Sequence, residues 1–254
     1  MAALEALPAL AETLPDDCSA DDSAPVHFAA MKGHTTALKA LARAGAALGE
    51  HNKDGRTPAH LAAPNGHVAA LEALAHAGAL LGERDKYGNT PAHWAARHGH
   101  TAALEALARA GAPLGERDNG GNTPAHWAAN NGKAAALEAL ARLGAPLGER
   151  KPDGSTPAHW AATNGHVTAL EALVQAGAPL GERDAGGRTL AHWAAARGQA
   201  AALEALPRTG ALLGERDKDG NTPAHWAAIN GHAAALEAPV SYTHLAGDSQ
   251  MTLP

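Results

Sequence analysis

The sequence predicts an all-α fold, a solenoid of stacked helix-turn-helix units joined by extended, hairpin-like fingers. Two observations carry this prediction. First, the tryptophans recur every 33 residues, and each stands in the string AHWAA: Trp94, Trp127, Trp160, Trp193 and Trp226. Second, the residues around each tryptophan recur with it. A fixed period of roughly 20 to 50 residues is typical of proteins that stack copies of one structural unit.

The first helix of the unit is predicted from the residues that begin and end it. In the copy that starts at Tyr87, Thr90 is a favourable N-cap, and Pro91 suits the first helical position because its missing N–H bonds nothing there. His93 occupies the third helical position, from which it can reach back to the cap. Gly99 is expected to end this short helix.

A second helix is predicted over roughly Thr101 to Ala110, with Leu104 and Leu107 on one face and Gly111 as its stop. The stretch from residue 113 to residue 118 then leads into an Asn/Gly-rich turn and forms the finger. The unit is therefore helix, turn, helix and finger.

These residues resemble the ankyrin repeat. The family pattern Gly-x-Thr-Pro-Leu-His-x-Ala-Ala-x-x-Gly-His appears here with Ala in place of the first Leu, and a Leu-rich helix and Gly-Ala follow it. The resemblance implies an ankyrin-repeat α-solenoid that binds other proteins. Leu190 replaces the proline of one copy, and Pro207 and Pro239 fall inside second helices, where an interior proline costs about 3 kcal/mol. The last two copies are therefore expected to be the loosest.

The period divides the chain into an ankyrin repeat domain over 21–238, with copies near 21–53, 54–86, 87–119, 120–152, 153–185, 186–218 and 219–238. Residues 1–20 are expected to form a truncated or atypical N-terminal capping segment, because AALEAL at 2–7 copies a second-helix core one residue out of register. Two interpretations stay open for 239–254. They resemble translated sequencing-adaptor read-through and so are not native, or they form a genuine disordered tail.

Composition limits the function classes. The formal charge of −6 argues against nucleic acid as the default partner. The single cysteine, Cys18, fits a reducing compartment. Every apolar run stays well short of 18 residues, and the first ten residues carry Glu5 and no positive charge, so neither a membrane span nor a secretory signal is expected. We expect a monomer that is intracellular, either cytoplasmic or nuclear.

The histidines and tryptophans are interpreted as structural. Zinc ligands must converge on one point, whereas residues repeated every 33 positions form rows. A stacking platform of tryptophans for nucleic-acid bases would need a cationic groove, which the sequence does not show. No catalytic constellation is present either, so we expect no enzyme activity, no metal and no cofactor. Besides the five tryptophans, the structural set comprises His93, His126, His159, His192 and His225.

Charged residues also recur. Glu105–Arg109, Glu138–Arg142 and Glu204–Arg208 have the i,i+4 spacing that favours ion pairs within a second helix. Glu-Arg pairs on the fingers are interpreted first as solvated rows and, as an alternative, as a partner contact: 83–84, 116–117, 149–150, 182–183 and 215–216.

Positions that differ between the copies are the candidates for partner binding. They lie at the finger tips and at the ends of the first helices, which the resemblance places on the concave surface of the solenoid. The alternative is that they vary only because nothing constrains them. The candidates are Arg56, Lys86, Tyr87, Asn89, Arg97, His98, Asn122, Asn130, Asn131, Ser155, Asn164, Arg188, Arg197, Asn221 and Asn230.

The sequence therefore predicts a non-catalytic scaffold or adaptor that binds a partner protein through the concave face of an ankyrin solenoid. An alternative stays open. The chain is then the regulatory ankyrin domain of a larger enzyme, ubiquitin-ligase adaptor or channel, whose remaining part is missing from this sequence.

Overall fold

A computed structural model describes residues 23–237. Every regular element within this range is a helix, and no strand occurs in it. The predicted all-α fold is confirmed. The expectations for residues 1–20 and 239–254, Pro239 included, fall outside the described residues.

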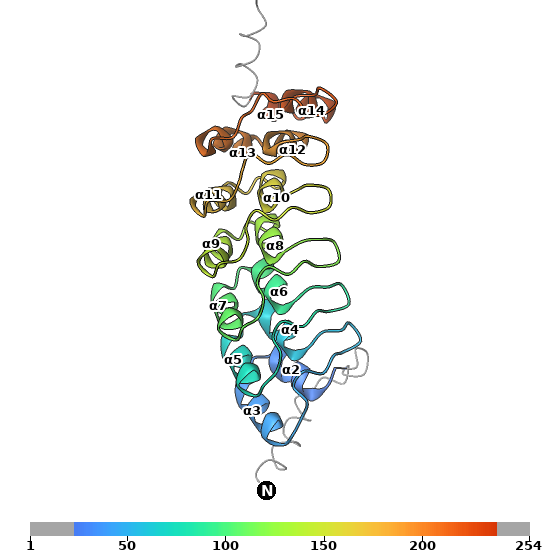
Figure 1. The fold of residues 1–254 in the computed structure, drawn as a ribbon, viewed down its shortest axis with the longest axis vertical. Helices are drawn as coiled ribbons and strands as arrows, with labels where there is room; N and C mark the ends of the chain where they lie inside the picture. The colour runs from blue at the N-terminus through green and yellow to red at the C-terminus, as the bar shows by residue number, and fades with distance from the viewer. Residues whose placement is uncertain (1–22, 238–254) are drawn as a thin grey trace, which may run out of the picture. The chain divides into compact units, whose positions relative to one another are not determined.

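The helices come in pairs, a first helix followed by a second one (Figure 1). The first helices are α2 (Pro25–Met31), α4 (Pro58–Ala62, continued by a 3-10 turn at Ala63–Asn65), α6 (Pro91–His98), α8 (Pro124–Asn130), α10 (Pro157–Thr163), α12 (Leu190–Ala196) and α14 (Pro223–Ile229). The second helices are α3 (Thr35–Arg43), α5 (Val68–His76), α7 (Thr101–Arg109), α9 (Ala134–Arg142), α11 (Val167–Gln175), α13 (Ala200–Ala205) and α15 (Ala233–Glu237).

The ends of the first helices follow from local chemistry. Thr90 is the N-cap of α6 in an extended conformation, and Pro91 takes the first helical position. Gly99 ends the helix in the left-handed region at a φ of 82°, which glycine adopts at little cost because it has no Cβ.

The described chain divides into two compact units. Of the described residues, the first unit comprises 23–124 and 142–145, and the second comprises 125–141 and 146–237. In the first unit, α2, α4 and α6 pack in one layer, and α3, α5 and α7 pack in another. In the second unit, α10, α12 and α14 form the first-helix layer, and α11, α13 and α15 form the second. Each unit is therefore a two-layer stack of helix pairs.

The two layers have different cores. Alanines fill the first-helix layer, where Ala62, Ala63, Ala95 and Ala96 are fully buried. Their small side chains let neighbouring first helices approach closely. Leucines fill the second layer, and each buried one stabilises the fold by about 1.5–3 kcal/mol. They include Leu71, Leu74, Leu104 and Leu107 in the first unit and Leu137, Leu140, Leu170, Leu173, Leu203 and Leu206 in the second.

Pro207 is accommodated in a way that the sequence does not predict. The helix α13 ends at Ala205 after six residues, and a 3-10 turn over Leu206–Thr209 completes the element. Proline tolerates this place because it stands near the start of the turn, where an N–H commonly has no acceptor within the helix. Leu206 remains fully buried beside it.

The fingers, the loops between one helix pair and the next, project on the side of the first helices (Figure 1). Neighbouring fingers within a unit are joined by one backbone hydrogen bond. The Lys86 N–H donates to the Asp54 carbonyl at 3.0 Å, and the Ala185 N–H donates to the Asp153 carbonyl at 2.8 Å. These bonds keep the tips of successive fingers together and so present their side chains on one surface of each unit.

Candidate functional site

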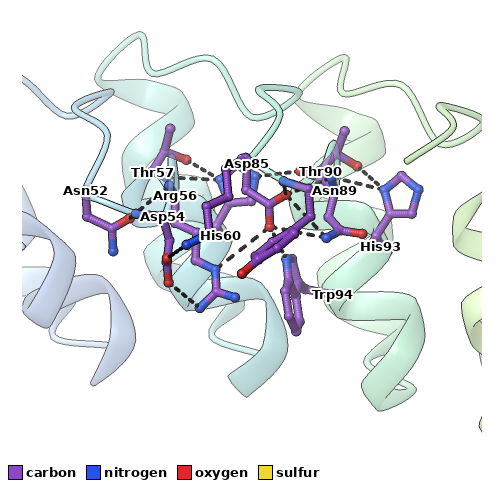
Figure 2. A network of polar contacts seen from close by, with 12 residues as sticks. Asn52, Asp54, Arg56, Thr57, His60, Asp85, Asn89, Thr90, His93 and Trp94 are labelled. Atoms are coloured by element: carbon purple, nitrogen blue, oxygen red, sulfur yellow. Dashed lines mark hydrogen bonds and ion pairs between the residues drawn. The ribbon is translucent and has the colours of Figure 1, made fainter. Parts of the chain in front are cut away.

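An acidic side chain at the base of the finger holds its tip. In the finger before α6, Asp85 Oδ1 accepts hydrogen bonds from the backbone N–H groups of Tyr87 (3.0 Å) and Asn89 (2.8 Å) (Figure 2). Gly88, at a φ of 80°, supplies the left-handed residue that this turn needs. Side chains at the same repeat position hold four other fingers: Asn52, Asp118, Asp184 and Asp217.

The same carboxylates bind the tryptophans. The Nε1–H of Trp94 donates to Asp85 Oδ2 at 3.3 Å. Because Asp85 accepts from both the finger and the indole, it fastens the tip of the finger to the first helix. The sequence analysis missed this role, although the recurrence of Asp at one repeat position is a signal that could have found it. Equivalent bonds join Trp193 to Asp184 at 2.9 Å and Trp226 to Asp217 at 2.8 Å.

A histidine near the start of the first helix links one repeat to the next. The Thr90 N–H donates to His93 Nδ1 at 3.0 Å. Since Nδ1 is the acceptor, the ring proton is on Nε2, which donates to the Asn122 carbonyl at 3.0 Å, 29 residues further along. The sequence indicated the contact with the cap but not the link between repeats. The same link joins His27 to Arg56, His60 to Asn89 and His192 to Asn221.

Burial favours the neutral form of four of the first-helix imidazoles. Desolvation lowers the pKa of His60 and of His159 to about 4, and it also lowers the pKa values of His93 and His192. His126 is buried as well, whereas His225, in the last described pair, is exposed.

A second set of histidines stands one residue after the glycine that ends the first helix. These histidines bond backbone carbonyls at the end of the first helix in the preceding repeat. His67 Nε2 donates to the Met31 carbonyl at 3.1 Å, and His100 Nε2 donates to the Pro64 carbonyl at 2.9 Å. The ring of His67 lies so close to Gly33 that a Cβ on this glycine would meet Nδ1 at 2.7 Å. This glycine is therefore required by the neighbouring repeat as well as by its own turn.

The tryptophans are half-buried rather than enclosed, and cations lie over several of their rings. The guanidinium carbons of Arg56 and Arg97 lie 4.8 and 5.5 Å from the Trp94 ring centre. His98 stacks on the same indole with ring centres 6.4 Å apart. In the second unit, Arg188 lies 5.1 Å from the Trp193 ring and 5.7 Å from the Trp226 ring. The indoles thus contribute to the surface as well as to the packing.

Trp160 has a different environment. Lys151 occupies the repeat position at which Asp85, Asp184 and Asp217 bind the other indoles. Trp160 Nε1 is consequently buried without a hydrogen-bond partner, and the Lys151 Nζ lies 4.7 Å from the centre of the ring. Asp153, two residues further on, takes over part of the turn by accepting from the backbone N–H and the hydroxyl of Ser155.

The structure separates the predicted partner-binding positions by exposure. Six are exposed: Lys86, Tyr87, His98, Asn164, Arg197 and Asn230. Seven are half-buried: Arg56, Arg97, Asn122, Asn130, Asn131, Arg188 and Asn221.

The remaining two predicted partner-binding residues need correction. Asn89 is only 6% exposed and Ser155 is fully buried. Each binds the aspartate of its own finger through its side chain, Asn89 to Asp85 and Ser155 to Asp153. Their variation between copies reflects alternative ways of closing the turn, so neither residue is available to a partner.

The predicted ion pairs within second helices also need correction. The arginines reach back 37 residues to the preceding repeat, where the side-by-side packing of second helices brings a glutamate within range. The pairs are Arg109–Glu72 at 2.9 Å, Arg142–Glu105 at 3.1 Å and Arg208–Glu171. On the fingers, Arg84 pairs with Glu116, Arg150 with Glu182 and Arg183 with Glu215.

Within residues 23–237, no group of three or more His, Cys, Asp or Glu side chains is placed to hold a metal ion. In the same range, no helix is both long and apolar enough to span a membrane.

Comparisons with known proteins agree with this geometry. The family model described as ankyrin repeats in three copies matches residues 2–85, 26–118, 77–150, 111–184 and 129–211. No curated protein matches the chain.

Two solved structures are similar. The ankyrin repeat domain of Bcl-3, described as a unique member of the IkappaB protein family, is 28% identical with a TM-score of 0.71. The match covers 82% of this chain and 95% of that one. The human ASB11 ankyrin repeat domain is 27% identical with a TM-score of 0.74, over 85% of this chain and 98% of that one. With the family model matching most of its length, the chain belongs to the ankyrin repeat family.

Proposed function

We propose that this chain is a non-catalytic scaffold or adaptor that binds a partner protein with its finger tips and the last residues of its first helices. One observation carries the proposal. At these positions exposed side chains differ from copy to copy, while the framework residues beside them recur and are hydrogen-bonded. Ankyrin repeat domains are in general protein-protein interaction domains, which supports the same conclusion.

The chemistry of the surface suits protein recognition. Tyr87 is 53% exposed, and Arg97 and Arg197 stand at the ends of their first helices. Tyrosine, tryptophan and arginine are the residues that most often dominate the binding energy of protein interfaces. We expect the chain to act as a monomer inside the cell, in the cytoplasm or the nucleus.

The test compares two charge-reversed variants of the full chain in affinity capture. The first variant carries Arg56→Glu, Arg97→Glu, Arg188→Glu and Arg197→Glu. The matched control reverses four arginines of the second helices: Arg43→Glu, Arg109→Glu, Arg142→Glu and Arg208→Glu. Circular dichroism checks that both variants keep the helix content of the wild-type chain.

A protein captured by the wild-type chain and by the control, but lost from the first variant, supports the proposal. Equal capture by all three chains, or loss only from the control, would refute the assignment of the binding surface.

A further inference from the structure

We propose that the surface around Trp94 binds an acidic segment of the partner protein, an inference that rests on the proposed function. This surface, called the Trp94 surface below, comprises Arg56, Lys86, Tyr87, Trp94, Arg97 and His98. The segment would place carboxylates on the two arginines and an apolar side chain against the exposed part of the indole.

Arg56 and Arg97 reach the same ring from different elements. Arg56 comes from the finger before α4, at 4.8 Å from the Trp94 ring centre, and Arg97 comes from the last turn of α6, at 5.5 Å. A planar guanidinium can bind a carboxylate with two parallel hydrogen bonds while its face stays on an aromatic ring. The indole therefore positions two anion-binding groups beside one apolar surface.

The surface is held in place before any partner arrives. The Trp94 N–H is bonded to the buried carboxylate of Asp85, and Arg56 Nε lies 3.8 Å from the same carboxylate (Figure 2). His98 Nδ1 bonds the Trp94 carbonyl at 2.9 Å and stacks on the indole. Binding would order few side chains, which lowers its entropic cost.

A second aromatic group, on the finger before α6, adds apolar area. Tyr87 is 53% exposed, and the Lys86 Nζ lies 5.0 Å from the centre of its ring. Lys86 also pairs with Asp54. Trp94 and Tyr87, which belong to the same unit, thus each have a cation over the ring.

The charge of this part of the molecule favours an anion. The tips of the fingers before α4 and α6 (52–56 and 85–89) and the last residues of α2, α4 and α6 with their C-caps carry five cations and two carboxylates. The cations are Lys32, Lys53, Arg56, Lys86 and Arg97, and the carboxylates are Asp54 and Asp85. Asp85 is only 5% exposed, so the charge that these positions present to solvent is mostly positive.

A short acidic segment fits this surface better than a nucleic acid does. The whole chain has a formal charge of −6, which repels an extended polyanion, whereas a few carboxylates meet only the local cations. The half-buried indole and the exposed tyrosine offer contacts to the apolar side chains of such a segment.

The test measures the fluorescence anisotropy of labelled probes with the full chain. The main probe is an eight-residue peptide of glutamate and leucine. Two further peptides replace its glutamates by glutamine or by lysine, and the last probe is a twelve-nucleotide oligothymidylate. Arg97→Glu is expected to weaken binding of the glutamate peptide about ten-fold or more. Lys151→Glu, which reverses a cation stacked on Trp160 in the second unit, is the matched control and should leave this binding unchanged.

Three results would overturn the inference: equal binding of the glutamine peptide, tighter binding of the oligothymidylate, or equal loss in Arg97→Glu and Lys151→Glu. A chain whose captured protein depends on the four arginines, but which does not bind the glutamate peptide, would keep the proposed function and disprove the acidic partner. A chain whose capture is independent of those arginines would disprove the proposed function itself.

Discussion

The environments of Trp94 and Trp160 show how one substitution changes a repeated structure. Both indoles follow the same Thr-Pro-Ala-His string at the start of a first helix. Trp94 donates to Asp85 and has two arginines on its faces, whereas the Trp160 N–H is buried and unpartnered with Lys151 over its ring. The helices and the finger form without the carboxylate, but the hydrogen bond that joins the finger to the indole of the first helix requires it.

Lowering the pH should have the largest effect on the free energy of unfolding, and it should act alike on the Trp94 and Trp160 regions. The unfolded chain binds protons at histidine near pH 6.5, while buried His60 and His159 stay neutral until about pH 4. Between these values the unfolded state holds more protons, so the free energy of unfolding falls as the pH falls. The loss approaches about 3 kcal/mol for each of the two histidines.

Urea unfolding at pH 7, 5.5 and 4 measures this effect. The variant His159→Gln removes one of the titrating groups and should reduce the pH-dependent loss by about 3 kcal/mol. An unchanged unfolding midpoint from pH 7 to pH 4 would show that the buried imidazoles do not govern stability.

Removing the Asp85 carboxylate should have the next largest effect. Truncating the equivalent residue of the Trp160 region, Lys151, should have a smaller one. Asp85→Ala leaves the Trp94 N–H and two finger N–H groups without their acceptor and leaves Arg56 without its buried partner. We expect a loss of about 3 kcal/mol in the free energy of unfolding. Lys151→Ala removes only a cation from the Trp160 ring and should cost less than about 1 kcal/mol. Equal losses in urea unfolding would contradict the comparison.

Supplying the missing carboxylate should have the smallest effect. Lys151→Asp offers the Trp160 N–H the acceptor that Asp184 and Asp217 give to their indoles, and we expect a gain of about 1 kcal/mol. Lys151→Asn is the matched control, because the amide of Asn52 holds the equivalent turn but offers only one oxygen. A gain in Lys151→Asn as large as that in Lys151→Asp would show that the turn, and not the indole, limits stability.

Much of the fold could be predicted from the sequence, because its signals are local. Thr90, Pro91 and Gly99 act on their own helix, so their spacing is enough to place its ends. Because the pattern recurs every 33 residues, the prediction made for one copy applies to the others.

The site was less predictable because its contacts join residues of neighbouring repeats, which are far apart in the sequence. Arg56 meets Trp94, and Arg109 meets Glu72, only after two repeats have packed together. The burial of Asn89 and Ser155 was missed for another reason. Variation between copies does not distinguish an exposed surface position from a position where different side chains close the same turn.

The hydrogen bonds made by the histidines have a consequence for how such a chain can change in length. Within a unit they join residues separated by 29 or 36 positions, one group reaching forward to the next finger and the other back to the previous helix. Removing or adding one complete 33-residue copy gives every remaining imidazole an equivalent carbonyl. An insertion or deletion of any other length within the helix pairs puts both groups out of register at once. Such a chain therefore gains or loses length most readily in whole repeats. The surface formed by its finger tips can be lengthened or shortened while the hydrogen bonds between repeats are kept.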